Sequence, residues 1–583
     1  MATATAHGSF QFPALAGSMP PSTQDEMNNA VHTLQERKDA WVGLAISERV
    51  ALLDRLVADC AALAERWVAA SLQGKRIPVD SPAASEEWLT GPYVTIKCLR
   101  QLRQALLDVE AVGRPKIPGP VTTRPDGQVV AQVFPLTGYD KAFFGGVKAE
   151  IWMEPGVTAA ALPDTQAVIY RDKQHAGKVA LVLGAGNVSS IGPTDILYKL
   201  LMEDQVVIFK SNPVNAYIGP IIEEAFKALI EPGFLRIVYG GAAEGAYLCN
   251  HAGVDEVHIT GSDKTFEAIV FGPGAEGAKR KAQRKPLLGK RVTGELGNVS
   301  PVIVVPGPWS AKDLAYQGDH IASMLTNNAG FNCNATRVII QHAGWSQREG
   351  LLQATRTVLT QVPPRSAYYP GARDRQQAFV AAHPEAEQIG TPADDQLPWT
   401  LITGVDPARD EDIVFTTEAF CSLFAETALD AADAVDYLNR AVEFANNYLW
   451  GTLNATILVH PASLKDPAMA AALDRAIANL RYGTVAVNYW AAAGFAMGAP
   501  SWGGFPGSDV YDVQSGIGVV HNTLLFNRPQ KTVIRAPFRS MPVPAWFVTQ
   551  GKTANKVYPK LTAFEANPSL GKLPGILWTA MAG

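Results

Sequence analysis

The chain has 583 residues, of which 47% are hydrophobic and 18% are charged, and its formal net charge at pH 7 is −5. This length exceeds a typical domain and predicts a soluble globular protein with two or more domains. The negative charge argues against a nucleic-acid-binding protein, which usually carries a basic surface. No apolar run approaches the roughly 18–20 residues of a membrane-spanning helix.

The cysteines are five in number and widely spaced, and no Cys or His pair has the spacing of a zinc site. We therefore predict a cytoplasmic protein with reduced cysteines and no bound metal. The first fifteen residues contain no Lys or Arg and no long apolar stretch. They indicate neither a secretion signal nor a transit peptide.

The N-terminal half begins with an arm and helices and continues as alternating strands and helices. Residues 1–27, rich in Ala, Thr, Ser, Gly and Pro, are expected to be extended. Helical spacing of apolar residues predicts helices within 27–72 and 84–109. Short apolar strands are expected at 179–183, 206–209, 234–238 and 257–259. Their alternation with helices is typical of a parallel α/β sheet with right-handed crossovers.

The C-terminal half continues this alternation. A basic, glycine-rich loop is expected over residues 272–289, as a solvated insertion or, alternatively, a phosphate-binding patch. Further α/β alternation is expected over 334–487. From about residue 536, many Pro, Gly and Trp residues indicate an extended tail that packs on the rest of the molecule.

A glycine-rich turn, Gly184-Ala185-Gly186-Asn187-Val188-Ser189, follows the first of these strands. It has three interpretations: a dinucleotide-binding fingerprint, a plain tight turn, or a position from which the Asn187 amide donates to an oxyanion. The fingerprint is imperfect, because Ser189 replaces its third glycine and no acidic residue ends the next strand.

Two other strand ends carry polar residues. Lys210 ends the second strand, where ligands bind in parallel sheets, although a lone lysine is more often a surface residue. Gly261 and Ser262 end the fourth strand and open a helix whose amides suit a pyrophosphate. Taken alone, such a turn is more often a simple helix cap.

A thiol and a carboxylate complete the set of candidate residues. Cys333 lies among small and amide residues, and Glu295 lies upstream between two glycines. Such a pair suggests covalent catalysis, in which the thiol attacks and the carboxylate activates water. Taken alone, Cys333 is more often a buried structural thiol and Glu418 a plain loop acid.

The order and spacing of these motifs resemble the aldehyde dehydrogenase superfamily over residues 30 to about 535. The matching stretches are 290–301 around Glu295, 328–333 ending at Cys333, 418–420, 483–488 and 502–505. The resemblance implies an α/β fold with a Rossmann-type cofactor domain, an α/β catalytic domain and a small β oligomerisation arm.

The resemblance also implies how the chain is divided. The expected parts are an N-terminal arm at 1–27, a dinucleotide-binding domain at 28–147 and 173–295, a catalytic domain at 296–517, an oligomerisation arm at 148–172 and 518–535, and a C-terminal tail at 536–583. Such an arm implies a homodimer or homotetramer.

The resemblance further implies a role for each site residue. Cys333 would attack the aldehyde, Asn187 and the Cys333 backbone N–H would hold the oxyanion, and Glu295 would activate water to hydrolyse the thioester. The residues implied to bind NAD or NADP are Lys210, Gly261, Ser262, Glu418 and Phe420.

Two departures from the family pattern concern the cofactor. Pro213 stands where the family often has a glutamate that repels a 2′-phosphate, so NADP is a plausible cofactor beside NAD. Phe266 stands where the second glycine of the helix start is usual, which puts the details of pyrophosphate binding in question.

The loop over residues 489–497 is aromatic and apolar and is expected to approach the substrate. The candidate substrate-binding residues are Tyr489, Trp490, Phe495 and Trp502. They favour a hydrophobic or bulky aldehyde, and ordinary core packing is the alternative.

Two other functions remain open at this point. The Gly-Asn-Val turn is similar to that of CoA-dependent acylating dehydrogenases and acyl-CoA reductases, but these need no hydrolytic base and Glu295 is present. A non-catalytic structural protein is less favoured, because Cys333, Glu295 and Asn187 are all retained.

Overall fold

The structure is a computed structural model that describes residues 19–171 and 174–582. Most of the expected N-terminal arm, residues 1–18, lies outside the described residues, and a helix begins at Gln24. None of the helices in the described ranges is long and apolar enough to cross a membrane.

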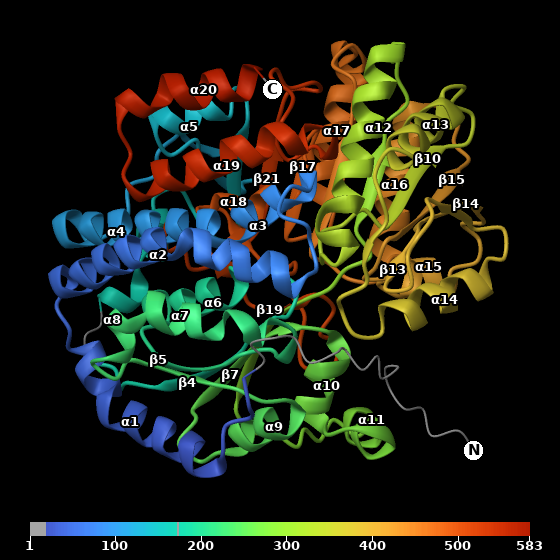
Figure 1. Cartoon of the computed structure of the whole chain (residues 1–583). Coiled ribbons are helices and arrows are strands. Elements are labelled where there is room, and N and C mark those ends of the chain that lie inside the picture. Colours follow the sequence, from blue (N-terminus) through green and yellow to red (C-terminus); the bar gives the residue numbers. More distant parts are fainter. Residues whose placement is uncertain (1–18, 172–173, 583) are drawn as a thin grey trace.

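Two sheets form the centre of the molecule (Figure 1). The six-stranded sheet has the order β19 (Gly516–Ile517), β8 (Arg291–Leu296), β7 (Glu256–Gly261), β4 (Val179–Leu183), β5 (Val206–Lys210) and β6 (Leu235–Val238). All neighbouring pairs are parallel except β19 with β8. The predicted parallel α/β sheet is therefore confirmed.

The second sheet has eleven strands. Their order is β1 (Val121–Thr123), β2 (Val129–Phe134), β3 (Lys148–Met153), β21 (Pro529–Arg535), β17 (Thr484–Val487), β16 (Asn454–Leu458), β9 (Pro301–Val304), β10 (Val338–His342), β15 (Leu423–Leu429), β14 (Trp399–Val405) and β12 (Glu387–Ile389). The strands from β21 to β14 are parallel to their neighbours, and β1, β2, β3 and β12 pair antiparallel. The strand β21 thus joins the mid-chain β2–β3 hairpin to the run of parallel strands from β17 to β14.

Helices cover both faces of the six-stranded sheet. On one face lie α6 (Ile191–Leu201) and α7 (Gly219–Ala225), with α2 (Ile46–Gly74) and α4 (Val94–Val112) stacked on them, and on the other lie α1 (Gln24–Val42), α9 (Ala242–Asn250) and α10 (Asp263–Phe271) (Figure 1). The eleven-stranded sheet carries α12 (Ala311–Thr326), α13 (Arg348–Leu359), α14 (Ala372–Ala382), α16 (Ala434–Asn447) and α17 (Pro467–Asn479). This layering buries most of the parallel strands of both sheets, whereas the edge strand β1 is exposed.

Three expectations about local structure are corrected. The helical pattern over 27–72 is two helices, because α1 ends at the Gly43 cap before α2 begins. The pattern over 84–109 is broken by a wide turn at Leu89–Tyr93, where Gly91 leaves helical geometry and is followed by Pro92. The basic loop over 272–289 contains a helix, α11 (Gly274–Ala282).

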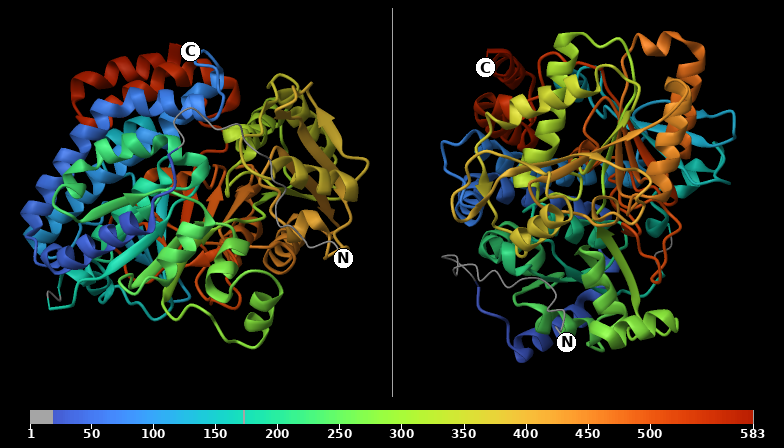
Figure 2. Two further views of the ribbon diagram at one scale, coloured as in Figure 1. Left: turned by 60° about the horizontal axis from the view of Figure 1, so that its bottom comes forward. Right: turned by 90° about the vertical axis from the view of Figure 1, so that its right-hand side faces the viewer.

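The expected extended tail is largely helical. It forms α19 (Gly551–Ala566) and α20 (Leu573–Ala582), which lie beside the N-terminal helices (Figure 2). Along α19, Ala554, Val557, Tyr558 and Leu561 recur at helical spacing and are buried. They pack against Tyr93 and its neighbours at the start of α4, so the tail does pack on the rest of the molecule.

Candidate active site

Cys333 lies just beyond a strained loop that follows α12. The loop begins with Asn327–Gly330, in which Asn328, Ala329 and Gly330 have φ of 52°, 56° and 81°. Such positive φ values are costly for residues with a side chain and persist only where the surroundings enforce them. The buried Arg337 guanidinium does so, because it donates to the carbonyls of Gly330, Asn332 and Cys421.

A buried ion pair supports the same loop from the other side. The Lys75 ammonium lies 2.8 Å from Glu87 and donates to Asn328 Oδ1 at 3.0 Å. The Asn328 amide in turn donates to the Asn187 carbonyl, and the Tyr368 hydroxyl contacts both residues. The loop that carries Cys333 and the turn that carries Asn187 are therefore parts of one hydrogen-bonded network.

Glu295 faces the Cys333 thiol from the end of β8. It is buried, and Trp502 Nε1 donates to its Oε1 at 3.1 Å. Burial is the main cause that raises the pKa of Glu295 to about 8, with Asp195 and Glu418 adding to it. Burial and the facing Glu295 raise the pKa of the half-buried Cys333 thiol. At neutral pH the pair is therefore mainly a thiol and a protonated carboxyl group.

Asn187 lies in the same cavity wall as Cys333 and Glu295. Its amide donates to the Phe331 carbonyl at 2.9 Å, two residues before Cys333. A buried side-chain amide beside a nucleophile is suited to stabilise negative charge on a substrate oxygen. The three residues named as catalytic candidates are thus brought together.

The glycines before Asn187 have a packing role. A Cβ on Gly184 would lie 2.6 Å from the Phe209 ring, and one on Gly186 would lie 2.7 Å from Asn212 Oδ1. The tight-turn interpretation accounts for both glycines, because β5 and the residues after it pack directly on this turn.

Three cofactor candidates lie at the carboxyl ends of strands in the six-stranded sheet. Lys210 ends β5, and its ammonium donates to the Gly240 carbonyl at 2.7 Å. Burial lowers the pKa of this lysine to about 8. Gly261 ends β7, and Ser262 caps α10 by accepting from the Thr265 N–H at 3.2 Å. Ligands bind at this edge in parallel sheets.

Phe266 leaves the start of α10 open. Its ring is fully buried in the core beneath the sheet, while Gly261 and Ser262 are exposed. The phenylalanine at this position, where the family usually has a glycine, therefore does not fill the space at the N-terminus of α10. The amides and dipole of that N-terminus favour an anion.

Glu418 and Phe420 lie in the segment just before β15, a strand of the eleven-stranded sheet. Glu418 Oε1 accepts from the Asn298 N–H at 3.2 Å, and a Cβ on Gly297 would lie 1.9 Å from Glu418 Oε2. Burial raises the pKa of Glu418 to about 7 against the opposing effect of Arg337. Phe420 has a φ of 40° and packs edge-on against the Tyr369 ring.

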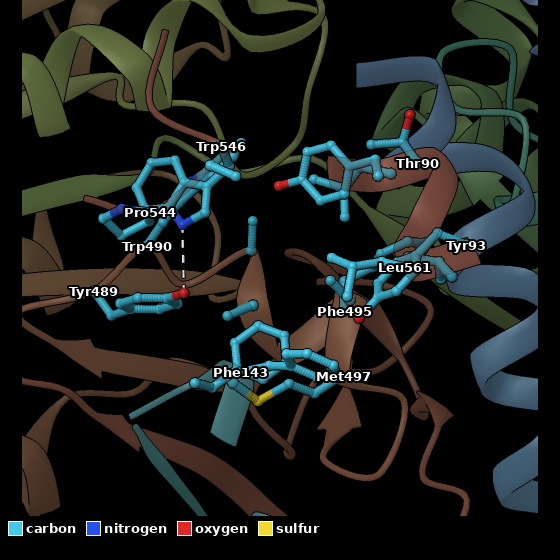
Figure 3. A pocket seen from close by; sticks show the side chains of 18 of the residues that line it. Thr90, Tyr93, Phe143, Tyr489, Trp490, Phe495, Met497, Pro544, Trp546 and Leu561 are labelled. Carbon is cyan, nitrogen blue, oxygen red and sulfur yellow. Dashed lines mark hydrogen bonds between the residues drawn. The ribbon is translucent and has the colours of Figure 1, made fainter. Parts of the chain in front are cut away.

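An apolar cavity of about 280 Å³ leads to Cys333, and Figure 3 shows some of the side chains that line it. Of the four substrate candidates, Tyr489, Trp490 and Phe495 line this cavity. Trp502 is fully buried outside the lining residues, where it holds Glu295.

Several lining residues were not singled out from the sequence. Those from the tail include Pro544, Trp546, Leu561 and Ile576, and those from elsewhere include Tyr93 and Phe143. Trp546 packs against the Tyr489 and Trp490 rings, and its indole N–H lies 3.4 Å from the Tyr489 hydroxyl. The helical spacing along residues 551–566 was the sequence signal that could have located the tail part of this wall.

Comparison with known sequences agrees with this geometry. The profile of the Aldehyde dehydrogenase family matches residues 179–378, which include Asn187, Lys210, Glu295 and Cys333. The chain is 31% identical over 186 residues to the 4-trimethylaminobutyraldehyde dehydrogenase of Bos taurus, covering 31% of this chain and 33% of that protein. It is 29% identical over 182 residues to the N-succinylglutamate 5-semialdehyde dehydrogenase of Novosphingobium aromaticivorans, covering 31% and 35%. The similarity thus spans about a third of these relatives.

Comparison with solved structures extends over most of the chain. The NADP-dependent glyceraldehyde-3-phosphate dehydrogenase of Bacillus halodurans, complexed with NADP, has a TM-score of 0.59 at 18% identity, covering 88% of this chain and 92% of that one. The NAD-dependent aldehyde dehydrogenase of Sinorhizobium meliloti also has a TM-score of 0.59 at 18% identity, covering 90% and 89%. Fold and site together define an α/β protein with the aldehyde dehydrogenase fold. Residues 179–378 match the aldehyde dehydrogenase family, and the fold of the chain is similar to that of solved aldehyde dehydrogenases.

Proposed function

We propose that the protein oxidises a hydrophobic or bulky aldehyde to a carboxylic acid with NAD or NADP, through a thioester on Cys333. The observation that carries this proposal is the placement of Cys333, Glu295 and Asn187 around one apolar cavity. The thiol supplies a nucleophile, the carboxyl group a base, and the amide a donor for the oxyanion.

In the proposed reaction, the Cys333 sulfur bonds to the aldehyde carbon as the thiol proton passes to solvent water. Asn187 and the Cys333 N–H stabilise the resulting oxyanion. After oxidation to the thioester, Glu295 removes a proton from water, whose oxygen bonds to the acyl carbon as the carbon–sulfur bond breaks. Since Trp502 fixes Glu295, the base keeps its position through both stages.

A nicotinamide dinucleotide fits the strand ends described above. The exposed start of α10 suits the pyrophosphate, Lys210 would contact the adenosine ribose, and Glu418 with Phe420 would contact the nicotinamide half. When bound, the cofactor accepts the hydride from the substrate carbon.

The choice between NAD and NADP is a separate question. Pro213 begins a short 3₁₀ helix, Pro213–Ile218, and provides no carboxylate to repel a 2′-phosphate. The Asn212 side chain is already used, because it accepts from the Val214 N–H and donates to the Gly184 carbonyl. We therefore propose that both cofactors bind, with Ser211 as the neighbouring hydroxyl.

The test is to mix purified protein with aldehydes of increasing size, NAD or NADP, and with or without CoA. We expect CoA-independent formation of reduced cofactor, fastest with apolar aldehydes, and its loss in Cys333→Ala. Turnover that requires CoA would support an acylating dehydrogenase instead. Turnover that survives Cys333→Ala would remove the nucleophile from the proposal.

The cellular setting and assembly are also proposals. The sparse cysteines support a reduced, cytoplasmic protein. The antiparallel pairing of β3 with β21 supports the proposal that these strands belong to an oligomerisation arm of a homodimer or homotetramer. Light scattering after gel filtration measures the mass of the assembly.

A further inference from the structure

A row of buried polar residues crosses the otherwise apolar layer between α6 and the six-stranded sheet. On β7 and β8 they are cross-strand pairs at every second position: Glu256 with Arg291, His258 with Thr293, and Thr260 with Glu295. Residues two apart on a strand face the same side, so these pairs form one file on one face. All except Arg291 are buried.

The helix α6 covers this file with polar residues of its own. The Thr260 hydroxyl donates to Asp195 Oδ2 at 2.7 Å, and His258 Nε2 lies 3.7 Å from the same oxygen. One turn further along α6, Lys199 lies 2.8 Å from Glu203 and 3.4 Å from Glu256. Buried polar groups are costly unless they are paired, so this arrangement is a built feature rather than incidental packing.

The row connects two different places. At one end Glu295 faces Cys333. At the other end the half-exposed Arg291 pairs with Glu203 and Glu256. Arg291 and Glu203 line a second cavity, of about 750 Å³, which shares no lining residue with the substrate cavity.

The proposed reaction must release protons. Aldehyde, oxidised cofactor and water give carboxylate, reduced cofactor and two protons, one of which passes through Glu295 at each thioester hydrolysis. The substrate cavity beside Glu295 is lined mainly by apolar and aromatic side chains, which cannot carry a proton.

We propose that the polar row conducts the proton of Glu295 to the second cavity. This inference rests on the proposed function. The proton on Glu295 moves to the Thr260 hydroxyl as the hydroxyl proton moves to Asp195. His258 next accepts the proton from Asp195 at its Nε2, an atom that has no hydrogen-bond partner among the described residues. His258 then returns to its neutral form by releasing a proton to the carboxylate of Glu256, two residues earlier on the same face of β7, and the cluster of Glu256, Glu203 and Arg291 passes this proton to solvent at the second cavity.

The charges around the row suit such transfers. Burial raises the pKa of Asp195 to about 7, although the Thr260 hydrogen bond and Lys199 oppose this shift. Burial raises the pKa of Glu295 to about 8. Donor and acceptor with similar pKa values exchange a proton at little cost. Burial, Lys199 and Arg291 hold the pKa of His258 well below its usual range, so His258 carries a proton only briefly.

The decisive variants change Thr260. Thr260→Val keeps the shape and removes the hydroxyl, whereas Thr260→Ser keeps the hydroxyl and removes a methyl group. Thr194→Val is the matched control, because the buried Thr194 hydroxyl donates to the backbone carbonyls of Ser190 and Ile191 at the start of α6. Rapid mixing with a reactive aldehyde separates the first burst of reduced cofactor, which reports thioester formation, from the later steady rate, which reports hydrolysis.

We expect Thr260→Val to keep the burst and to lower the steady rate by at least about tenfold, the scale of a lost proton-transfer group. Thr260→Ser and Thr194→Val should stay within about threefold of the natural protein. Asp195→Asn should lower the steady rate as well, and it should move the pH at which the rate rises to a lower value, because it removes a negative charge that raises the pKa of Glu295.

Other outcomes overturn the inference. Equal losses in Thr260→Val and Thr260→Ser would indicate packing, and an unchanged steady rate in Thr260→Val would exclude conduction through the hydroxyl. A lost burst would place the effect before hydrolysis. If the natural protein forms no reduced cofactor with any aldehyde, the proposed function itself fails.

Discussion

At the scale of single residues, the site contains carboxyl groups whose pKa values are raised by burial. Glu295, Glu418 and Asp195 all have raised pKa values, with burial as the largest cause in each. A base that is half protonated near pH 8 works best above that pH. The same burial has a consequence for stability, because the native state binds protons that the unfolded chain has released.

Glu295→Gln should therefore stabilise the protein increasingly as the pH rises. The folded pKa of Glu295 is raised from 4.5 to about 8, so its favourable contribution is complete below pH 4.5 and is lost as the pH rises through 8. Glutamine does not titrate, and the gain in unfolding free energy should reach a few kcal/mol above pH 8. Urea unfolding at pH 6 and pH 9 measures it.

The control for this experiment is Glu276→Gln, at an exposed position on α11. It should leave the unfolding free energy unchanged at both pH values. A Glu295→Gln difference that is the same at pH 6 and pH 9 would mean that Glu295 has an ordinary pKa.

A second residue-scale prediction concerns the buried pair of Lys75 and Glu87. Lys75→Met leaves the Glu87 carboxylate without its partner and should lower the unfolding free energy by about 3–5 kcal/mol. It also removes a donor to the strained Asn328, so kcat should fall. Arg55→Met, in the exposed pair with Glu231, is the control and should cost at most about 1 kcal/mol. Equal losses in both variants would contradict the role given to Lys75.

At the scale of elements, the tail α19–α20 and the segment before it form part of the substrate cavity wall. Trp546→Ala should raise the KM for bulky apolar aldehydes about tenfold or more, because a large buried contact area is lost. The KM for acetaldehyde should change by less than about threefold, since a small substrate does not reach that wall. Steady-state kinetics with a series of aldehydes of increasing size measures both values.

Trp578→Ala is the control within the same tail. Trp578 is 71% exposed on α20 and is not a lining residue. Its removal should leave the KM for every aldehyde in the series unchanged. Equal effects of the two tryptophan substitutions would mean that the tail acts only through general stability.

Some of the strands and site residues could be predicted from the sequence, whereas the tail helices and the contacts between distant segments could not. The strands β4, β5 and β7 were predicted because they are short apolar runs bounded by turn residues. Cys333, Glu295 and Asn187 were proposed as site residues because the order and spacing of their motifs resemble a known family, and the structure places them around one cavity. The tail helices were not predicted, because the Pro and Gly residues of this region indicate extended structure although its apolar residues recur at helical spacing. The role of Trp502 and the polar row beside α6 depend on contacts between distant segments, which no local pattern contains.

At the scale of the whole molecule, cofactor binding should be measurable without any substrate. A ligand that binds only the folded state, at a concentration of about a hundred times its Kd, stabilises the folded state by about 2.7 kcal/mol. NAD and NADP should therefore each raise the Tm of the protein, and Lys210→Met should reduce the rise for both. Calorimetry with each cofactor measures the change. A Tm that neither cofactor moves would contradict the proposed binding site.

The groups proposed for chemistry and the residues that form much of the cavity wall lie in different parts of the chain, and this separation has an evolutionary consequence. The groups proposed for chemistry lie within residues 179–378, while much of the cavity wall comes from 489–497 and 540–580. Transplanting residues 540–580 between related proteins should therefore alter which aldehyde is accepted and leave the reaction itself intact, because this segment excludes Trp502, which donates to Glu295. New specificities can arise by changing one end of the chain, without risk to the nucleophile and its base.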